Sequence, residues 1–305
     1  MPHHALTCSI PLPQGFRRKD FLALHSRDER MVSEKTTSRS VTKGIPWDGS
    51  PACLRIVLHK DAVMAKLAVD GPPRDGGTVR LEQTVRRMLG LDQPVAAFEA
   101  AYAGHPLLGG LVAANLGLCV SQTASPFEAL SWAILGQLVS VRAAVAMRRK
   151  FTLAAEIKHS SGLWCFPDAR AVAVMDVPAL RACGLSQTKA LSLQTLARSV
   201  SSGDLPLDAW LDAARAGRLD ADEVRARLGA IRGIGPWTVS YALLRGFGYL
   251  DGSLHGDVAV RRNLARLLHK ETVTEKETET WLTPFSPWRA LVAAHLWAMQ
   301  SRDGY

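Results

Sequence analysis

The sequence lacks the features that mark a secreted or membrane-spanning protein. No apolar run approaches the ~20 residues that a membrane helix needs. The opening stretch MPHHALTCSIPLPQGFRRKD has no basic start followed by an apolar block and a small-residue cleavage site. The 5 cysteines are odd in number and scattered, so they predict neither a disulfide framework nor a metal spacing such as C-x-x-C. We therefore expect reduced thiols, no structural metal and a cytoplasmic protein.

Acidic side chains are outnumbered by basic ones, 28 Asp and Glu against 37 Lys and Arg, and the net charge is +9. Such an excess suits a polyanionic partner such as nucleic acid, although many basic proteins bind none. With 305 residues, of which 47% are hydrophobic, the chain has the size and composition for about two or three domains with sizeable cores.

The first third of the chain has the pattern of a small α+β domain, which we place at residues 1–112. Residues 1–50 are polar, and we expect irregular structure there. Residues 54–69, LRIVLHKDAVMAKLAV, mix β-branched and apolar residues as one or two strands do. After a Gly/Pro-rich break, residues 78–91 space their apolar side chains like a helix, with Thr78 as the expected N-cap.

From Ser125 onward the pattern is helical, and we expect an all-α module over residues 113–305. Ser125 is placed to cap a helix, Pro126 suits its first position, and Glu128 completes a capping box. The apolar spacing then continues and predicts one long helix with an apolar face of Phe127, Leu130, Ile134, Leu138, Val141 and Val145. Further helices are expected at 168–175, 176–183, 187–201, 207–215, 221–231, 236–247, 257–269, 274–283 and 287–301.

A short turn, GAIRGIGPWTVSY at 229–241, joins two of these helices in an expected hairpin over 223–247. Gly233 and Gly235 can take positive φ without strain and let another backbone approach, and Ile234 would anchor the turn in the core. Because the start of a helix exposes unpaired N–H groups and a positive dipole end, the turn could bind a phosphate. The alternative is an ordinary tight turn.

The loop after the second hairpin helix, about residues 248–258, contains an aspartate in a useful position. Asp257 precedes an apolar-periodic run and should cap the helix that begins there. The helix that starts near Trp237 would point back toward this loop. A carboxylate there, beside a bound DNA backbone, could stabilise positive charge developing on a sugar or orient a water molecule against it. Capping alone is the alternative.

Four ordered motifs resemble those of a known enzyme family. The run LGAIRGIGPWT followed by LHGDVAV is similar to the helix–hairpin–helix, Gly/Pro-rich loop and Asp signature of the DNA glycosylase superfamily of that name. FEALSWAILGQLVSVRAA at 127–144 and SPWRALVAAHLW at 286–297 resemble its AlkA-type 3-methyladenine glycosylases, as does WCFPDARAVAVMDVPALRACGLSQTKALSL. The resemblance covers residues 110–301. It implies a mainly α helix–hairpin–helix glycosylase bundle with a β-rich N-terminal domain.

The resemblance makes Asp257 the catalytic aspartate, and it places Trp237 where lyase-competent relatives have a nucleophilic lysine. An amine there would form a Schiff base and lead to strand cleavage, whereas an indole cannot. A monofunctional glycosylase is therefore implied. The four-cysteine cluster of the endonuclease III type is absent too, because no cysteine follows Cys183. Trp288 and Arg289, in the SPWR motif, are interpreted as structural, with a guanidinium that could face a phosphate.

The resemblance also assigns a base pocket to Trp237, Tyr241 and Trp297. Methylation at N3 or N7 makes a purine cationic, and electron-rich rings stack on cations. Leu138 matches the wedge that fills the gap left by a flipped nucleotide. Core packing is the alternative for the aromatic residues and for Leu138. Gln137 either faces the DNA gap, which we favour, or binds a buried carbonyl.

The implied function is hydrolysis of the N-glycosidic bond of alkylated purines, such as 3-methyladenine and 7-methylguanine, in duplex DNA during base excision repair. No cofactor or metal is implied, although hairpin carbonyls could hold an alkali ion. We expect a monomer in the bacterial cytoplasm, at the nucleoid and not at a membrane. Two alternatives stay open: a glycosylase of the same fold that acts on deaminated or oxidised bases, and a catalytically silent DNA-binding module.

Overall fold

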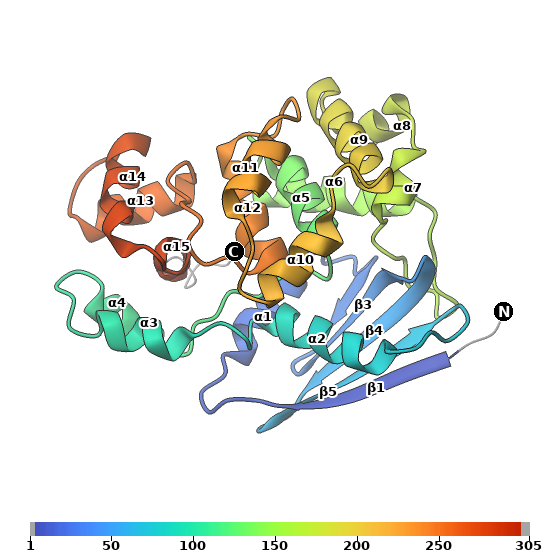
Figure 1. Cartoon of the computed structure of the whole chain (residues 1–305), viewed down its shortest axis with the longest axis horizontal. Coiled ribbons are helices and arrows are strands. Elements are labelled where there is room, and N and C mark those ends of the chain that lie inside the picture. The colour runs from blue at the N-terminus through green and yellow to red at the C-terminus, as the bar shows by residue number, and fades with distance from the viewer. Residues whose placement is uncertain (1–3, 300–305) are drawn as a thin grey trace.

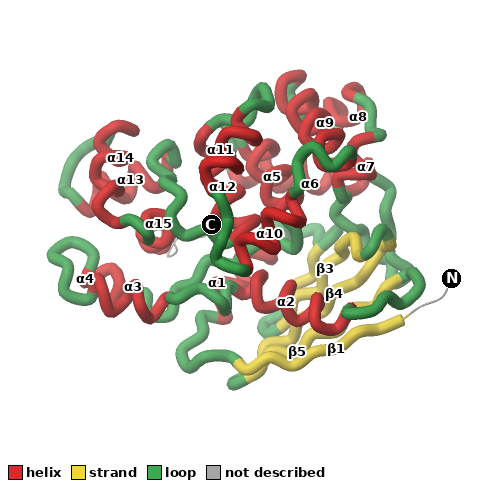
Figure 2. Tube along the Cα trace, in the orientation of Figure 1, coloured by secondary structure: helices red, strands yellow, loops and turns green. Residues whose placement is uncertain are grey.

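An antiparallel five-stranded sheet forms the first part of the molecule, in the order β1-β5-β4-β3-β2 (Figures 1 and 2). The structure is a computed structural model and describes residues 4–299. Helix α2 packs on the sheet through buried residues such as Leu81, Val85 and Met88. The elements of this part are β1 His4–Pro11, α1 Arg18–His25, β2 Glu34–Thr36, β3 Ser40–Trp47, β4 Ser50–Leu58, β5 Ala62–Val69 and α2 Gly77–Leu89.

The strands β4 and β5 confirm the prediction for residues 54–69, but the irregular structure predicted for residues 1–50 is wrong. Strands β1, β2 and β3 and helix α1 lie there. Strand β3 alternates the buried apolar residues Val41, Ile45 and Trp47, but Lys43 interrupts this pattern. Lys43 is buried through ion pairs. The carbonyl of Gly44 accepts a hydrogen bond from the N–H of Phe166 at 3.2 Å. Tertiary contacts, rather than local pattern, stabilise this strand.

The helices predicted after residue 167 are confirmed, with limits that differ by a few residues. The last prediction ran to residue 301, and its residues 300 and 301 lie outside the described chain. The helices outside the sheet region are α3 Val95–Tyr102, α4 Gly109–Ala113, α5 Pro126–Gly136, α6 Val141–Ala154, α7 Ala169–Ala173, α8 Val177–Ala182, α9 Gln187–Ser201, α10 Leu207–Arg215, α11 Ala221–Gly229, α12 Pro236–Phe247, α13 Val258–Leu267, α14 Glu275–Leu282, the 3₁₀ turn η1 Thr283–Phe285 and α15 Arg289–Ala298.

Two local predictions at the first helices had different outcomes. The cap of α5 is confirmed, because Ser125 Oγ accepts a hydrogen bond from the N–H of Glu128 at 3.2 Å. The capping box is not formed, since Glu128 Oε2 accepts from the N–H of Ala124 at 3.1 Å. The cap of α2 is wrong. Thr78 lies inside that helix, whose N-cap is Gly76 in the left-handed region, at φ 71°, with no side-chain hydrogen bond. A glycine adopts this backbone conformation without the strain that a side chain would add.

The single long helix predicted from Ser125 is also wrong, since α5 ends at Gly136 and α6 begins at Val141. Ser140 caps the new helix by accepting a hydrogen bond from the N–H of Ala143 at 3.2 Å. Leu138 lies in the break at φ 53°, a left-handed value that does not occur within a right-handed α-helix. The apolar spacing passes through the break by coincidence, because Leu138 and Val141 are exposed instead of packed.

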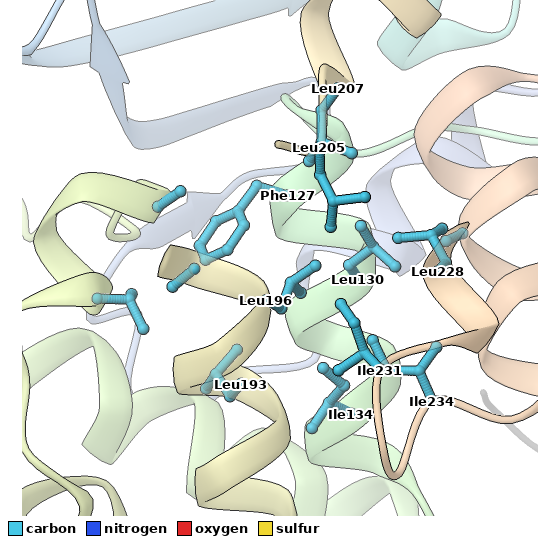
Figure 3. Packing of buried hydrophobic residues seen from close by; sticks show 14 of the residues in the cluster. Phe127, Leu130, Ile134, Leu193, Leu196, Leu205, Leu207, Leu228, Ile231 and Ile234 are labelled. Carbon is cyan, nitrogen blue, oxygen red and sulfur yellow. The ribbon is translucent and has the colours of Figure 1, made fainter. Parts of the chain in front are cut away.

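Buried residues within 4–299 form three clusters. One lies between the sheet and α2, and one lies among α5–α12 (Figure 3). The third joins α3 and α4 to α13, α14 and α15, which Figure 1 shows together on the side away from the sheet. The division of the chain at residue 112 stays a prediction, but α3 and α4 pack with the C-terminal helices. By packing alone, we propose that the first unit ends near Leu91.

A buried ionic cluster joins the sheet to α5 and α6. Lys43 Nζ lies 2.5 Å from Glu34 Oε1 and 2.5 Å from Glu128 Oε1. Arg148 Nη2 lies 2.8 Å and 3.0 Å from the same two oxygens. Burial alone would raise the pKa of both carboxyls, but the charges of Arg148 and Lys43 outweigh it. The pKa of Glu34 is held well below its ordinary value, and that of Glu128 is lowered too.

Candidate active site

A cleft of about 1530 Å³ opens between the hairpin, the turn between α5 and α6, helix α1 and the start of α13. Its lining comes from segments that are far apart in the sequence, among them residues 17–27, 118–121, 136–144, 229–245, 253–259 and 294–298. Every residue that the sequence singled out for the site lines it: Gln137, Leu138, Gly233, Ile234, Gly235, Trp237, Tyr241, Asp257 and Trp297.

The hairpin is α11, the turn 230–235 and α12, and its two glycines differ. Gly233 has φ 89°, and a Cβ added there would collide with Ser192 Oγ of α9. Gly235 has φ −92°, so it does not use its freedom to take positive φ, and a Cβ there would meet nothing within 4 Å. The turn therefore needs Gly233 for its own geometry, whereas no protein contact requires a glycine at Gly235.

The side chain of Ile234 lies in the core as predicted, 4% exposed among the residues of α5, α9 and α11 (Figure 3). With that anchor inside, the backbone of Gly233 and Gly235 lines the cleft. Helix α12 starts at Pro236, and no side chain accepts a hydrogen bond from its first N–H groups. These groups and the positive end of the helix dipole suit an anion.

The carboxylate of Asp257 is held by four N–H donors. Oδ1 accepts hydrogen bonds from the backbone N–H groups of Ala259 at 2.9 Å and Val260 at 3.0 Å. Asp257 thus caps α13, as predicted. The indole Nε1 of Trp297 donates to Oδ1 at 3.1 Å, and that of Trp237 donates to Oδ2 at 2.9 Å. Capping is therefore only part of its role in the structure, since two tryptophans from α12 and α15 converge on the same carboxylate.

Aromatic rings form a wall of the cleft next to Asp257. The rings of Trp237 and Tyr241 share a face of α12, with centroids 5.5 Å apart and planes tilted by 36°. Tyr241 and Trp297 are 9% and 8% exposed. Core packing and a place in the pocket were the alternatives for these residues, and both apply, because Tyr241 and Trp297 pack in the interior and also line the cleft.

The turn between α5 and α6 brings Leu138 and Gln137 to the same cleft. Leu138 is fully exposed, so packing in the core is not its role. The amide Nε2 of Gln137 donates to the carbonyl of Gly233 at 2.8 Å and to Thr238 Oγ1 at 2.8 Å. The side-chain nitrogen therefore binds a hairpin carbonyl, as the alternative has it, while Gln137 also lines the cleft. That Gln137 faces the DNA gap stays a prediction.

Sequence reasoning missed several residues of the cleft. Arg245 lies four residues after Tyr241 and eight after Trp237, on the same side of α12, and that spacing could have revealed it. Its Nη1 donates to the carbonyl of Ser121 at 2.6 Å, and its Cζ lies 5.7 Å from the ring centroid of Trp297. Further missed residues are Trp132 of α5 and Arg17, Lys19, Leu24 and Arg27 of the α1 region, where no helix was predicted.

Arg289 lies outside the residues that line the cleft, and its possible phosphate contact stays a prediction. Its Nε lies 2.6 Å from Asp251 Oδ1, and its Nη2 lies 3.0 Å from Asp251 Oδ2, so the guanidinium is paired within the protein.

Between residues 4 and 299, no helix has the length and apolar character to cross a membrane. Nor does that range contain a group of three or more His, Cys, Asp or Glu side chains arranged to hold a metal ion.

Comparison with known proteins gives concordant results. A DNA-3-methyladenine glycosylase of Bacillus subtilis is 22% identical over 299 residues, which are 94% of this chain and 95% of that protein. DNA-3-methyladenine glycosylase 2 of Escherichia coli is 31% identical over 196 residues, which are 62% of this chain and 63% of that protein. The fold is that of a 3-methyladenine DNA glycosylase structure from Archaeoglobus fulgidus, with a TM-score of 0.80, 20% identity and coverage of 97% of this chain and 98% of that one.

A family description, HhH-GPD superfamily base excision DNA repair protein, matches residues 131–287. That range is more than half of the chain and contains the turn with Gln137 and Leu138, the hairpin, and Asp257. The resemblance seen in the sequence motifs is thereby confirmed. The chain belongs to the HhH-GPD superfamily of base excision DNA repair proteins.

Proposed function

We propose that this protein is a monofunctional DNA glycosylase that hydrolyses the N-glycosidic bond of alkylated purines in duplex DNA. The substrates would include 3-methyladenine and 7-methylguanine, and the protein would act as a monomer on the chromosome in a bacterial cytoplasm. The observation that supports this most is the carboxylate of Asp257, which two indole N–H groups hold inside a cleft beside the hairpin. The names of the relatives from Bacillus subtilis and Escherichia coli agree with it.

The geometry suggests how the parts would work on DNA. The amides at Gly233, Gly235 and the start of α12 would hold a backbone phosphate without reading sequence. Leu138 would enter the base stack while the damaged nucleotide swings into the cleft. The cationic base would then stack on the rings of Trp237 and Tyr241.

Asp257 would act on the bond itself. As the glycosidic bond breaks, its electron pair leaves with the base, which becomes neutral if it was a methylated cation. Positive charge develops on the sugar, and a carboxylate nearby stabilises it. Water then adds its oxygen to the sugar carbon and gives up a proton, and Asp257 is placed to orient it. The product is an abasic site.

Trp237 supports a reaction without strand cleavage. A lyase needs an amine that attacks the sugar, and an indole provides none. Among the cleft-lining residues of the described chain, the one lysine is the exposed Lys19 of α1, on a different element from Trp237. We therefore infer that the abasic site is released with the DNA strand intact.

Arg245 favours a second candidate function, a glycosylase for neutral bases with acceptor groups on their edge. A guanidinium has five N–H donors, and within the described residues that of Arg245 donates one hydrogen bond, to the carbonyl of Ser121. Deaminated purines carry an oxygen where such a donor would bind. A cationic base needs no such hydrogen-bond donor, and a nearby guanidinium would repel it.

The test is release of bases from methylated duplex DNA by the native chain. We expect 3-methyladenine and 7-methylguanine to appear in solution, and strands to break only after alkali treatment. Nicking before alkali would contradict the monofunctional assignment. DNA binding without release of a methylated base would contradict the alkyl-purine assignment. A panel of deaminated and oxidised bases would then distinguish the second candidate from a silent DNA-binding module.

A further inference from the structure

The turn between α5 and α6 presents one apolar side chain to the cleft. Helix α5 ends where Gln137 takes ψ 127°, and Ser140 starts α6 three residues later. Between them Leu138 has φ 53° and is fully exposed. A non-glycine residue in the left-handed region costs about 1–2 kcal/mol. Its own packing does not stabilise this conformation, so other contacts of the turn must do so.

Gln137 provides such contacts, and it makes them with the hairpin. Its amide Nε2 donates to the carbonyl of Gly233 at 2.8 Å, although the two residues are 96 positions apart. The same nitrogen donates to Thr238 Oγ1, in the first turn of α12, at 2.8 Å. One side chain therefore connects the turn that holds Leu138 to both halves of the phosphate-binding feature proposed above.

Helix α9 supports the same arrangement from behind. Lys189 Nζ donates to the carbonyl of Leu135, in the last turn of α5, at 2.9 Å. Ser192, one turn further along α9, donates from Oγ to the carbonyl of Arg232 in the hairpin at 2.6 Å. The end of α5 and the hairpin are thus attached to one helix, and Gln137 joins them directly on the cleft side.

We propose that Gln137 is a positioning residue that couples the hairpin to Leu138. When the hairpin binds a backbone phosphate, Gln137 sets the distance between that phosphate and the point where Leu138 enters the base stack. The proposal rests on the proposed function, since it assumes that DNA binds the hairpin and that a base leaves the stack. Gln137 itself contacts no reacting atom and acts through Leu138.

A double-mutant cycle tests this coupling. Gln137→Met keeps the length of the side chain and removes its amide. Loss of two hydrogen bonds should lower the single-turnover rate of base release from duplex DNA by ~10-fold. In a chain that already has Leu138→Ala, the same change should lower the rate by less than ~2-fold, because the residue through which it acts is gone. An equal ~10-fold loss in both chains would overturn the proposal.

A matched control separates coupling from stability. Gln194, in the helical core, also donates its Nε2 to a carbonyl, that of Met175, at 2.8 Å, and it does not line the cleft. Gln194→Met should lower the midpoint of thermal unfolding without changing base release at temperatures where the chain is folded. If Gln194→Met slows release as much as Gln137→Met does, Gln137 has only a structural role.

Fluorescence of 2-aminopurine placed beside the target base measures unstacking without any bond cleavage. We expect Gln137→Met to reduce the fluorescence increase that the native chain causes, to the level seen with Leu138→Ala. An unchanged increase would contradict the coupling even if no base were released. If the native chain unstacks DNA, Gln137→Met reduces this unstacking and no methylated base is released, the proposed function fails and the coupling stands.

Discussion

Glu34 and Glu128, between the sheet and α5, are held by full positive charges, whereas Asp257 in the cleft is held by neutral N–H groups. The two glutamates share Lys43 and Arg148 at 2.5–3.0 Å. Asp257 receives four hydrogen bonds, two from backbone N–H groups and two from indoles. The same chemical group is thus bound in two different ways within one molecule.

The difference separates a structural carboxylate from a reactive one. In the ionic cluster the charge of each glutamate is neutralised where it lies, which joins the sheet to the helices and leaves no charge for a ligand. Dipoles orient Asp257 but do not cancel its charge. A cation that develops in the cleft would therefore interact with it at short range, in a site that excludes part of the water.

The largest expected effect comes from removing a cation from the ionic cluster. Lys43→Met removes one of the two buried cations that Glu34 and Glu128 share and leaves Arg148 between them, and it should lower the free energy of unfolding by about 3–5 kcal/mol. Urea titration measures this. As a control, Lys276→Met removes an exposed ion pair with Glu279 and should change stability little. Equal effects of the two substitutions would show that burial of the cluster does not matter.

Acid should weaken the same cluster. The folded-state pKa values of Glu34 and Glu128 lie below the ordinary value of 4.5. Their stabilisation is therefore present above pH 4.5 and is lost as the pH falls through their folded-state pKa. The free energy of unfolding should decrease with falling pH in this range, and less steeply in Glu128→Gln. Urea titrations at several pH values between about 5 and 3 measure the slope. If the free energy of unfolding fell as steeply with pH in Glu128→Gln as in the native chain, Glu128 would not contribute to this pH dependence.

The two hairpin glycines extend the comparison to the backbone. Gly233→Ala should lower the free energy of unfolding by at least about 1–2 kcal/mol, because of its positive φ and the contact with Ser192. Gly235→Ala should leave it within ~0.5 kcal/mol. The added methyl would nevertheless stand where a phosphate approaches, and we expect ~10-fold weaker DNA binding by fluorescence anisotropy. Native binding by Gly235→Ala would show that the phosphate does not lie there.

A smaller effect is expected at the indole of Trp237. Trp237→Phe keeps an aromatic wall but removes one hydrogen bond to Asp257, so single-turnover base release should fall by ~5-fold. Trp210 offers a control away from the cleft, since its Nε1 donates to Glu223 Oε1 at 3.3 Å. Trp210→Phe should leave the rate of release unchanged in the folded chain. Equal losses of rate would mean that Trp237 acts through stability alone.

Features that depend on local chemistry could be predicted from the sequence. The hairpin turn needs its glycine, proline and anchoring isoleucine next to one another, and Asp257 caps the helix that follows it directly. The starts of α8, α9 and α14 follow from the caps Asp176, Ser186 and Thr274. Because all of these signals lie within a few residues of the structure they produce, pattern and spacing suffice.

Features that depend on distant partners could not be predicted. β3 contains a lysine and a glycine that become favourable only against α5, α6 and residues 164–166. The break at Leu138 follows an unbroken apolar spacing, and it is stabilised by bonds of Gln137 to residues about a hundred positions away. Helix α1 was not predicted, and neither were the charged residues at that side of the cleft, such as Arg17, Lys19 and Arg27. Tertiary contacts override local pattern in each case.

The most direct test of the account is the rate of base release by Asp257→Asn. Asparagine caps a helix about as well as aspartate, and of the hydrogen bonds to Asp257 only that from Trp237 to Oδ2 is lost, so folding and DNA binding should stay close to native. The charge that stabilises the sugar is lost, and release of 3-methyladenine and 7-methylguanine under single-turnover conditions should fall by ~10²–10⁴-fold. Release within about threefold of the native rate, with DNA binding retained, would contradict the assignment of Asp257 as the catalytic carboxylate.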